Sequence, residues 1–330
     1  MLEKEKIEFL ETRIKTFPCF PLSLLPTPCH KLDRLSEDLG LEIYCKRDDL
    51  TGFGLGGNKT RKLELLVGEA LEHGHDTLVT CGGIQSNFCR LTAAAGAAAG
   101  MEVHLILGGG RPQKETGNLI LDRLVGAHIH HVSSSNWGDW EAQSDALVEE
   151  LESKGRKVFK IPIGGSVPTG AVGYVSAFLE ILRDEERLGI SFDHIIHATG
   201  SGGTQAGLVA GMALTGRQGR ITGISVSAGK QEMEEIVYEL AFNTTALLGG
   251  KLDRESVLVD DRFIGPAYGV STLKGEEAIR VFARKEGVFL DRVYTGKAAS
   301  GLLAGIKKGE ITGGRVLFLH TGGQPELFAE

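Results

Sequence analysis

One lysine lies in a glycine-rich turn where it could act as a nucleophile. Lys59 follows Gly56, Gly57 and Asn58, after an expected strand at 41–46, and we expect a helix to begin near Lys59. Glycines let the backbone pass close to a ligand, and Asn58 is of the residue type that caps a helix N-terminus. A lysine that faces a pocket loses its proton through desolvation, and its neutral amine attacks an aldehyde. We therefore expect Lys59 to form a Schiff base with pyridoxal phosphate.

Two other glycine motifs overlap the same turn. The glycines of 52–57 match the dinucleotide pattern G-x-G-x-x-G, and 52–60 nearly matches the P-loop pattern. An extra residue between Gly57 and Lys59 breaks the P-loop spacing. The dinucleotide pattern follows directly on a strand, whereas 46–51 intervene here. We favour the Schiff-base lysine over dinucleotide binding and over a purely structural turn.

A second glycine-rich loop has the composition of a phosphate site. It follows an expected strand at 193–198, opens an alanine-rich helix, and contains Gly200, Ser201, Gly202, Gly203 and Thr204. Free amides and the positive end of a helix bind anions, and the two hydroxyls could add donors. The alternative is a tight turn needed only for packing. We expect phosphate binding, because three glycines beside hydroxyl residues exceed what packing requires.

A third loop, which also joins a strand to a helix, could bind a substrate carboxylate. Gln85, Ser86 and Asn87 follow Gly82 and Gly83 and place polar groups beside free amides. Ser86 could equally be a simple helix cap.

Two tyrosines are candidates for an active-site wall. Tyr268 and Tyr294 each stand near a glycine in an expected loop, although either could be a core or interface tyrosine. Trp137 and Trp140 have helical spacing and are expected to pack against the domain.

No metal site is expected. Strand alternation puts His128 and His130 on one face and His131 on the other, without an accompanying carboxylate pattern.

The cysteines, odd in number and without C-x-x-C spacing, indicate reduced thiols in the cytoplasm; they are Cys19, Cys29, Cys45, Cys81 and Cys89.

The composition excludes several classes of protein. The chain has 330 residues, 42% of them hydrophobic and 24% charged, and a formal net charge of −7. This acidic balance, without a polybasic run, disfavours nucleic acid and anionic lipid as partners. No window reaches the roughly 18 apolar residues of a membrane helix, and the charged start of the chain lacks a signal core. We expect a cytoplasmic protein with no nucleic-acid or membrane partner.

Short apolar runs alternate with helical patterns along most of the chain. This repetition predicts an α/β fold with mostly parallel strands and helices on both faces of the sheets. Strands are expected at 77–81, 102–107, 127–132, 157–161, 193–198, 221–226 and 315–320, and helices at 86–99, 116–124, 137–153, 170–188, 273–285 and 297–307.

The turn at 164–170 is the best candidate for a crossing between two domains. We expect a smaller domain at 60–165. The remaining segments, 1–59 plus 166–330, would form a larger cofactor-binding domain, with the active site in the cleft between the two.

Several segments together resemble the pyridoxal phosphate enzymes of the tryptophan synthase β-like fold (fold type II). More narrowly, they resemble the family of 1-aminocyclopropane-1-carboxylate deaminase and D-cysteine desulfhydrase. The resemblance runs from about Pro26 to the C-terminus. Its most specific parts are 46–49, 57–64, 85–87, the Gly200 loop and 320–323.

The resemblance implies a role for each candidate residue. Lys59 would be the cofactor lysine, Lys62 would help to hold the phosphate, Asn87 would hydrogen-bond the ring hydroxyl, and Thr295 would stand near the pyridine nitrogen. The residues that would face the substrate are Gln85, Ser86, Asn87, Tyr268 and Tyr294. Lys59 or Ser86 would remove the α-proton, and a homodimer is expected.

Within the family, Thr295 and Thr321 bear on substrate choice. The deaminases that open a cyclopropane ring resemble one another in having Glu and Leu there, whereas desulfhydrase-like members have hydroxyl residues. By this likeness we expect β-elimination from D-cysteine to pyruvate, ammonia and hydrogen sulfide. Phe88 departs from the desulfhydrase pattern, which has His at that position.

The alternatives are 1-aminocyclopropane-1-carboxylate deamination, elimination from L-cysteate, D-serine or β-chloroalanine, and a catalytically silent ligand-binding protein.

Overall fold

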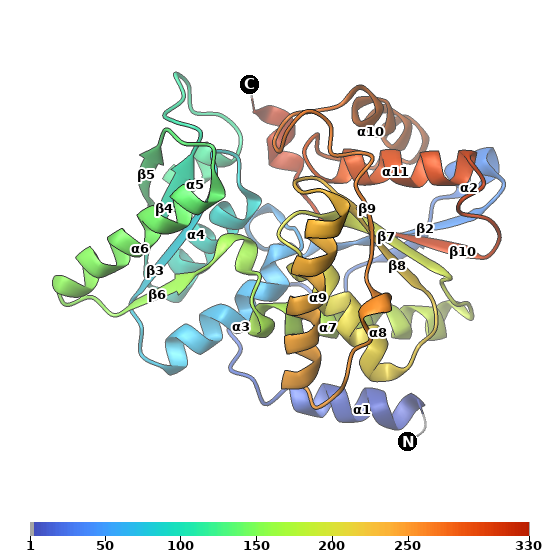
Figure 1. Ribbon diagram of the computed structural model, residues 1–330, viewed down its shortest axis with the longest axis horizontal. Coiled ribbons are helices and arrows are strands. Elements are labelled where there is room, and N and C mark those ends of the chain that lie inside the picture. Colours follow the sequence, from blue (N-terminus) through green and yellow to red (C-terminus); the bar gives the residue numbers. More distant parts are fainter. Residues whose placement is uncertain (1–2, 330) are drawn as a thin grey trace.

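The computed structural model describes residues 3–329, which form two β-sheets with helices on both faces of each (Figure 1). The larger sheet has the order β1-β2-β10-β7-β8-β9, in which only β1 is antiparallel to its neighbour. Its strands are β1 (Cys29–Lys31), β2 (Glu42–Arg47), β7 (His194–Thr199), β8 (Arg220–Ser225), β9 (Leu258–Asp260) and β10 (Arg315–His320).

The smaller sheet is wholly parallel and has the order β5-β4-β3-β6. Its strands are β3 (Thr77–Gly83), β4 (Glu102–Gly108), β5 (His128–Val132) and β6 (Val158–Ile161). They all lie within the middle part of the chain, while both ends of the chain supply the larger sheet. The exact domain limits at 59/60 and 165/166 stay a prediction.

Eleven α-helices, besides short 3-10 turns, are present in the described residues: α1 (Glu3–Ile14), α2 (Asp33–Leu39), α3 (Lys59–Glu72), α4 (Asn87–Ala99), α5 (Asn118–Leu124), α6 (Trp137–Ser153), α7 (Pro168–Leu188), α8 (Gly203–Thr215), α9 (Lys230–Leu247), α10 (Leu273–Glu286) and α11 (Thr295–Lys307). No helix in residues 3–329 is both long and apolar enough to cross a membrane.

Alternation along the strands divides the core of the larger sheet into two layers. On β10, Leu317 and Leu319 pack with α7, α8 and α9, whereas Val316 and Phe318 pack with α2, α10 and α11. Side chains two apart on a strand point to the same face. The expectation of mostly parallel sheets with helices on both faces is therefore confirmed.

Helix α3 joins the two halves of the molecule. It packs against α7 of the larger unit and α4 of the smaller one. Gly173 on α7 makes the first contact possible, because a Cβ there would lie 2.2 Å from the Arg61 carbonyl oxygen. The residue that begins α3 is Lys59, so the candidate lysine stands where the two units meet.

The expected elements lie within a few residues of the observed ones, but several elements had no prediction. These are α1, α2, α9, β1 and β9. Helix α9 buries Met233, Val237, Leu240, Ala241 and Thr244 on one side. That spacing is helical, so the signal for α9 was present in the sequence.

Candidate active site

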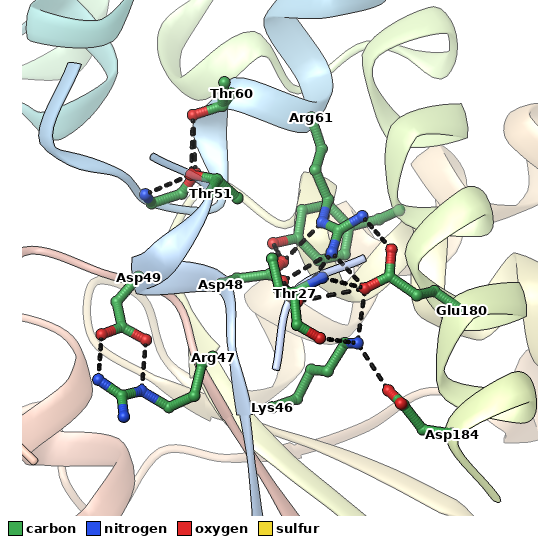
Figure 2. Close-up of polar contacts among 12 residues, drawn as sticks. Thr27, Lys46, Arg47, Asp48, Asp49, Thr51, Thr60, Arg61, Glu180 and Asp184 are labelled. Atoms are coloured by element: carbon green, nitrogen blue, oxygen red, sulfur yellow. Dashed lines mark hydrogen bonds and ion pairs between the residues drawn. The ribbon is translucent and has the colours of Figure 1, made fainter. Parts of the chain in front are cut away.

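A buried network of charges holds the first turn of α3 in place (Figure 2). The Arg61 guanidinium donates to both oxygens of Asp48, at 2.8 and 2.9 Å, and to Glu180 on α7 at 3.0 and 3.1 Å. All three side chains are at least nine-tenths buried. Since an unpaired buried charge is costly, each partner requires the others.

The same network reaches back into the larger sheet. Lys46 on β2 lies 2.5 Å from Glu180 Oε1 and 2.6 Å from Asp184 Oδ2. Tyr174 on α7 donates its hydroxyl to Asp48 Oδ2 at 2.6 Å. The segment after β2, helix α7 and the start of α3 are therefore joined by ionic contacts, which explains the clustered charges of 46–49.

Asn58 does not cap helix α3 as we expected. Its backbone is already helical, at φ −57° and ψ −22°, and its side chain makes no capping hydrogen bond. The Asn58 side-chain amide instead donates to Thr204 Oγ1 at 2.8 Å, and its backbone N–H donates to the Thr321 carbonyl at 3.0 Å. Asn58 thus ties the lysine turn to the first turn of α8 and to the segment that follows β10.

Lys59 lies at the wall of a cleft between the two units. Burial lowers the pKa of the Lys59 amine from its ordinary value to about 8. The charged form of an amine is disfavoured away from water. A larger fraction of Lys59 is therefore neutral, and able to attack a carbonyl carbon, than of an exposed lysine.

The loop at the start of α8 lines the same cleft as Asn87 and has the shape of an anion cradle. Gly200, Ser201, Gly202, Gly203 and Thr204 all line the cleft. A Cβ at Gly203 would stand 2.5 Å from Lys62 Nζ and 2.8 Å from Ser166 Oγ, so this space is open only because residue 203 is glycine. The first amides of a helix have no partner within that helix.

Lys62 lies beside this cradle. Its amine donates to the Gly164 carbonyl at 3.1 Å, and Gly164 itself lines the cleft. Burial, and then the nearby charge of Lys59, hold the pKa of Lys62 well below its ordinary value. An anion in the cradle would stabilise the charged form of this buried amine.

His197 on β7 was not predicted, and it is close enough to both lysines for their charges to act on it. Burial lowers the pKa of this imidazole to about 4, so the ring adds no further positive charge beside Lys59 and Lys62 at neutral pH.

Ser86 is the N-cap of α4, as the alternative interpretation held, and it also lines the cleft. Its hydroxyl oxygen accepts from the Cys89 N–H at 3.2 Å. Gly82 makes room for this arrangement, since a Cβ there would stand 2.7 Å from Ser86 Oγ.

Asn87 is oriented by a residue that had no predicted role. Asn118 donates its side-chain amide to Asn87 Oδ1 at 2.9 Å and to the Gln85 carbonyl at 2.8 Å. Because Asn87 Oδ1 is an acceptor in this contact, its NH₂ group is left to face the cleft. The Gln85 side chain is engaged inside the protein with Thr116 and Asn118, and it lines a neighbouring hollow.

The two tyrosines meet at the cleft. The hydroxyl oxygens of Tyr268 and Tyr294 lie 2.5 Å apart. Burial raises the pKa of Tyr268 to about 12 and, together with Tyr268, raises the pKa of Tyr294 well above its ordinary value. Both phenols therefore keep their protons at neutral pH.

The indoles of Trp137 and Trp140 line the cleft as well, a role that was not predicted for them. Trp137 meets the Tyr268 ring edge-on at 5.3 Å. Trp140 is buried against Gly108, where a Cβ would overlap the indole. The sequence signal for this role was the position of the two tryptophans in the chain, shortly after β5.

The two threonines that bear on substrate choice occupy different places. Thr321 lines the cleft. Thr295 is fully buried and is not among the residues of the cleft wall; its hydroxyl donates to Asp291 Oδ1 at 2.6 Å and accepts from the Asp291 N–H at 2.8 Å. A role for Thr295 at a pyridine nitrogen stays a prediction.

The residues present fit a phosphorylated aldehyde. The cleft combines a lysine of lowered pKa, a glycine cradle at a helix N-terminus and an oriented amide. A model of the family described as "Pyridoxal-phosphate dependent enzyme" matches residues 21–322. The chain belongs to this family of enzymes.

Individual relatives agree with this assignment. The enzyme is 40% identical over 328 residues to a protein of Burkholderia lata and 37% identical over 326 residues to one of Methylobacterium nodulans. Each alignment covers 95–96% of this chain and 97% of the other, and both proteins are named 1-aminocyclopropane-1-carboxylate deaminase.

A solved structure described as that of an "ACC deaminase homologue" superposes with a TM-score of 0.90 at 36% identity, covering 97% of this chain and 96% of that chain. The fold is therefore that of the fold type II pyridoxal phosphate enzymes, and the cofactor is pyridoxal 5′-phosphate. These two relatives carry the name of the alternative substrate, 1-aminocyclopropane-1-carboxylate, and not that of D-cysteine.

Proposed function

We propose that this enzyme deaminates a small α-amino acid, with 1-aminocyclopropane-1-carboxylate as the first candidate substrate. The names of relatives that match nearly the whole chain support this substrate. The observation that carries the reaction class is Lys59, an amine of lowered pKa at a cleft that also holds the glycine cradle. Deamination of this substrate consumes one water and yields 2-oxobutanoate and ammonia.

When bound, pyridoxal phosphate supplies an electron sink that stabilises negative charge on substrate carbons. Lys59 would hold it covalently, the Gly200–Thr204 loop and Lys62 would bind its phosphate, and Asn87 would donate to its ring hydroxyl. Ser86 would donate its hydroxyl proton to the substrate carboxylate.

Lys59 is the better candidate than Ser86 for moving a proton at a substrate carbon. Its amine is neutral in a substantial fraction of molecules because its pKa lies near 8. Ser86 Oγ already accepts a helix-capping bond, and no histidine or carboxylate within residues 3–329 is hydrogen-bonded to this oxygen. The tyrosine pair would act as a proton donor, because both phenols stay protonated and one can donate to the other.

The second candidate is β-elimination from D-cysteine, which consumes one water and yields pyruvate, ammonia and hydrogen sulfide. One observation favours it: Thr321, of the type that the desulfhydrase likeness calls for, lines the cleft. L-cysteate, D-serine and β-chloroalanine are substrates of the same elimination class.

The test is release of 2-oxo acid and of sulfide from each of these amino acids by the purified holoenzyme, with Lys59→Ala as the control. We expect 2-oxobutanoate from 1-aminocyclopropane-1-carboxylate without sulfide. Sulfide from D-cysteine with no ring opening would replace the first candidate by the second. If the enzyme turns over none of these amino acids, the remaining interpretation is a catalytically silent ligand-binding protein.

We also propose that the enzyme is a homodimer. Exposed apolar side chains gather around one hollow formed by Leu50, Leu55, Ile120 and Phe328, and large exposed apolar patches mark interaction surfaces. Light scattering on a size-exclusion column should give twice the mass of the chain, and Leu55→Ser with Phe328→Ser should shift it towards the monomer.

A cytoplasmic location is likewise proposed, supported by five free cysteines.

A further inference from the structure

One face of the smaller sheet carries a cluster of acidic and imidazole groups at its edge. Glu102 and His104 stand two residues apart on β4, and His128 and His130 stand two apart on the edge strand β5. The strands are parallel and pair His104 with His128. Because alternate side chains share a face, the four groups lie together, although 102 and 128 are far apart in sequence.

Glu102, His104 and His128 each have one potential metal-ligand atom close to those of the other two. His104 Nε2 lies 2.7 Å and His128 Nε2 lies 3.6 Å from the same oxygen, Glu102 Oε1. The two imidazole rings are stacked, with centroids 4.7 Å apart and planes at 17°. One ligand atom from each residue lies within 4.8 Å of the others. Ligands that surround a zinc ion at about 2.0–2.2 Å are separated by roughly 3–3.5 Å.

His130 is placed to set the tautomer of His104. Its Nε2 lies 3.0 Å from His104 Nδ1. A histidine that binds a metal through one nitrogen usually donates its other N–H to a neighbouring acceptor, which fixes the ring. With His104 Nδ1–H donating to His130, His104 Nε2 has its lone pair free for an ion.

One oxygen of the Glu102 carboxylate pairs with an arginine outside the cluster, and the other oxygen faces the histidines. Arg156 Nη2 lies 2.9 Å from Glu102 Oε2, the oxygen that does not face the histidines. Burial, and then the charges of neighbouring histidines, lower the pKa of His104 and of His130. Glu150 on α6 adds a negative charge near both rings.

We propose that Glu102, His104 and His128 bind a divalent transition-metal ion of the Zn²⁺ class, with His130 as a positioning residue. Nitrogen-rich ligand sets with a carboxylate suit Zn²⁺, Ni²⁺ or Co²⁺ and not Mg²⁺ or Ca²⁺. The ion lies between His104 Nε2 and Glu102 Oε1, and the single N–H of the His104 ring is on Nδ1, facing His130, so that binding releases no proton. Water completes the coordination.

The site lies at the opposite end of the sheet from the cleft. Glu102 and His128 begin their strands, whereas the cleft is lined by Gly82 and Gly83 at the end of β3 and by Trp140 beside Gly108 at the end of β4. An ion here would join the edge strand β5 to β4 (Figure 1) and would not take part in the reaction. The proposal is therefore independent of the substrate.

The experiment is Zn²⁺ binding to holoenzyme that has been treated with a chelator, followed by calorimetry and by metal analysis after dialysis. We expect one ion per chain to be retained, with an increase in the melting temperature. His128→Ala and Glu102→Gln should each weaken binding at this site at least tenfold, and His130→Ala about tenfold.

His131→Ala is the matched control, because His131 stands on the same strand but points to the other face. This variant should bind Zn²⁺ as the unmodified enzyme does, and His128→Ala should release 2-oxo acid at the unmodified rate. Retention of the ion by both His128→Ala and Glu102→Gln would overturn the proposal. So would the absence of any stoichiometric ion in the unmodified enzyme.

Discussion

The Arg61 guanidinium binds the Asp48 carboxylate through two hydrogen bonds, from Nη2 to Oδ1 at 2.8 Å and from Nε to Oδ2 at 2.9 Å. Arg61 is two residues from the catalytic lysine candidate, and Asp48 directly follows β2. The pair therefore fixes the first turn of α3 against the edge of the larger sheet. The direction in which Lys59 enters the cleft depends on charges that never contact a ligand.

Removing Arg61 should therefore destabilise the protein strongly. In Arg61→Met, Asp48 and Glu180 would be left without their shared cation, and breaking a buried pair in this way costs about 3–5 kcal/mol of unfolding free energy. Urea denaturation measures the loss. Arg183→Met is the control, since its contact with Glu11 is exposed and such pairs contribute at most about 1 kcal/mol. Equal losses in the two variants would contradict the assigned role of the network.

The two lysines of the turn should separate in their effects. Lys59→Ala should abolish both activity and the absorbance band of covalently bound cofactor, because no other amine stands at that place in the turn. Lys62→Ala should weaken cofactor retention while the band persists at high cofactor concentration, since Lys62 lies beside the Gly203 cradle. Equilibrium dialysis and absorbance spectra distinguish them. Loss of the band in Lys62→Ala alone would show that the wrong lysine was assigned.

Covalent attachment of the cofactor to the apoenzyme should depend on pH with a midpoint near 8. Raising the pH deprotonates Lys59, and only the neutral amine attacks the aldehyde. With a pKa of about 8, the attachment rate should rise about tenfold per pH unit below the midpoint and then level off. Reductive trapping and peptide mapping follow it. An N-acetyl-lysine control should continue to rise towards pH 10, and an identical profile for the protein would contradict the lowered pKa.

Local chemistry made the glycine cradle and the lysine turn predictable, because both follow directly from consecutive residues. Asn58 was predicted wrongly as a cap, since its amide is drawn to Thr204, a partner 146 residues away in the chain. Long-range partners of this kind cannot be deduced from local sequence preferences.

The register between paired strands was the second feature that the sequence did not predict. Nothing in the sequence around His128 indicates that Glu102 and His104 lie beside it, because that proximity depends on how β4 pairs with β5. For the same reason the contact between Asn118 and Asn87 had no sequence signal. The fold class, in contrast, followed from the alternation of strands and helices alone.

Filling the cradle at Gly203 should impair cofactor binding. A methyl group in Gly203→Ala would lie 2.5 Å from Lys62 Nζ and 2.8 Å from Ser166 Oγ, in the space assigned to the phosphate. We expect the dissociation constant of pyridoxal phosphate to rise at least tenfold. Gly229→Ala, also next to a helix start, is the control because a Cβ there meets nothing closer than 4.0 Å. Unchanged affinity in a folded Gly203→Ala protein would reduce this loop to a packing element.

Substitution of Thr321 should test the choice between the two candidate substrates with less loss of stability than substitution of Thr295. Glutamate at position 295 would place a second carboxylate beside the fully buried Asp291, whose oxygen now accepts from the Thr295 hydroxyl, so that variant should be destabilised. Leucine at position 321 removes a hydroxyl from the cleft wall and adds apolar bulk. One such contact is worth about 0.5–1.5 kcal/mol, or about two- to twelvefold in rate.

Thr321→Leu should therefore raise the ratio of ring opening to D-cysteine elimination about two- to twelvefold. The ratio is measured as 2-oxobutanoate from 1-aminocyclopropane-1-carboxylate against sulfide from D-cysteine, each under subsaturating conditions. Thr321→Ser keeps the hydroxyl and should leave the ratio near that of the unmodified enzyme. Because the two variants differ in the hydroxyl and in apolar bulk, a fall in both rates by the same factor would indicate lost packing. The same ratio in all three proteins would exclude Thr321 from substrate choice.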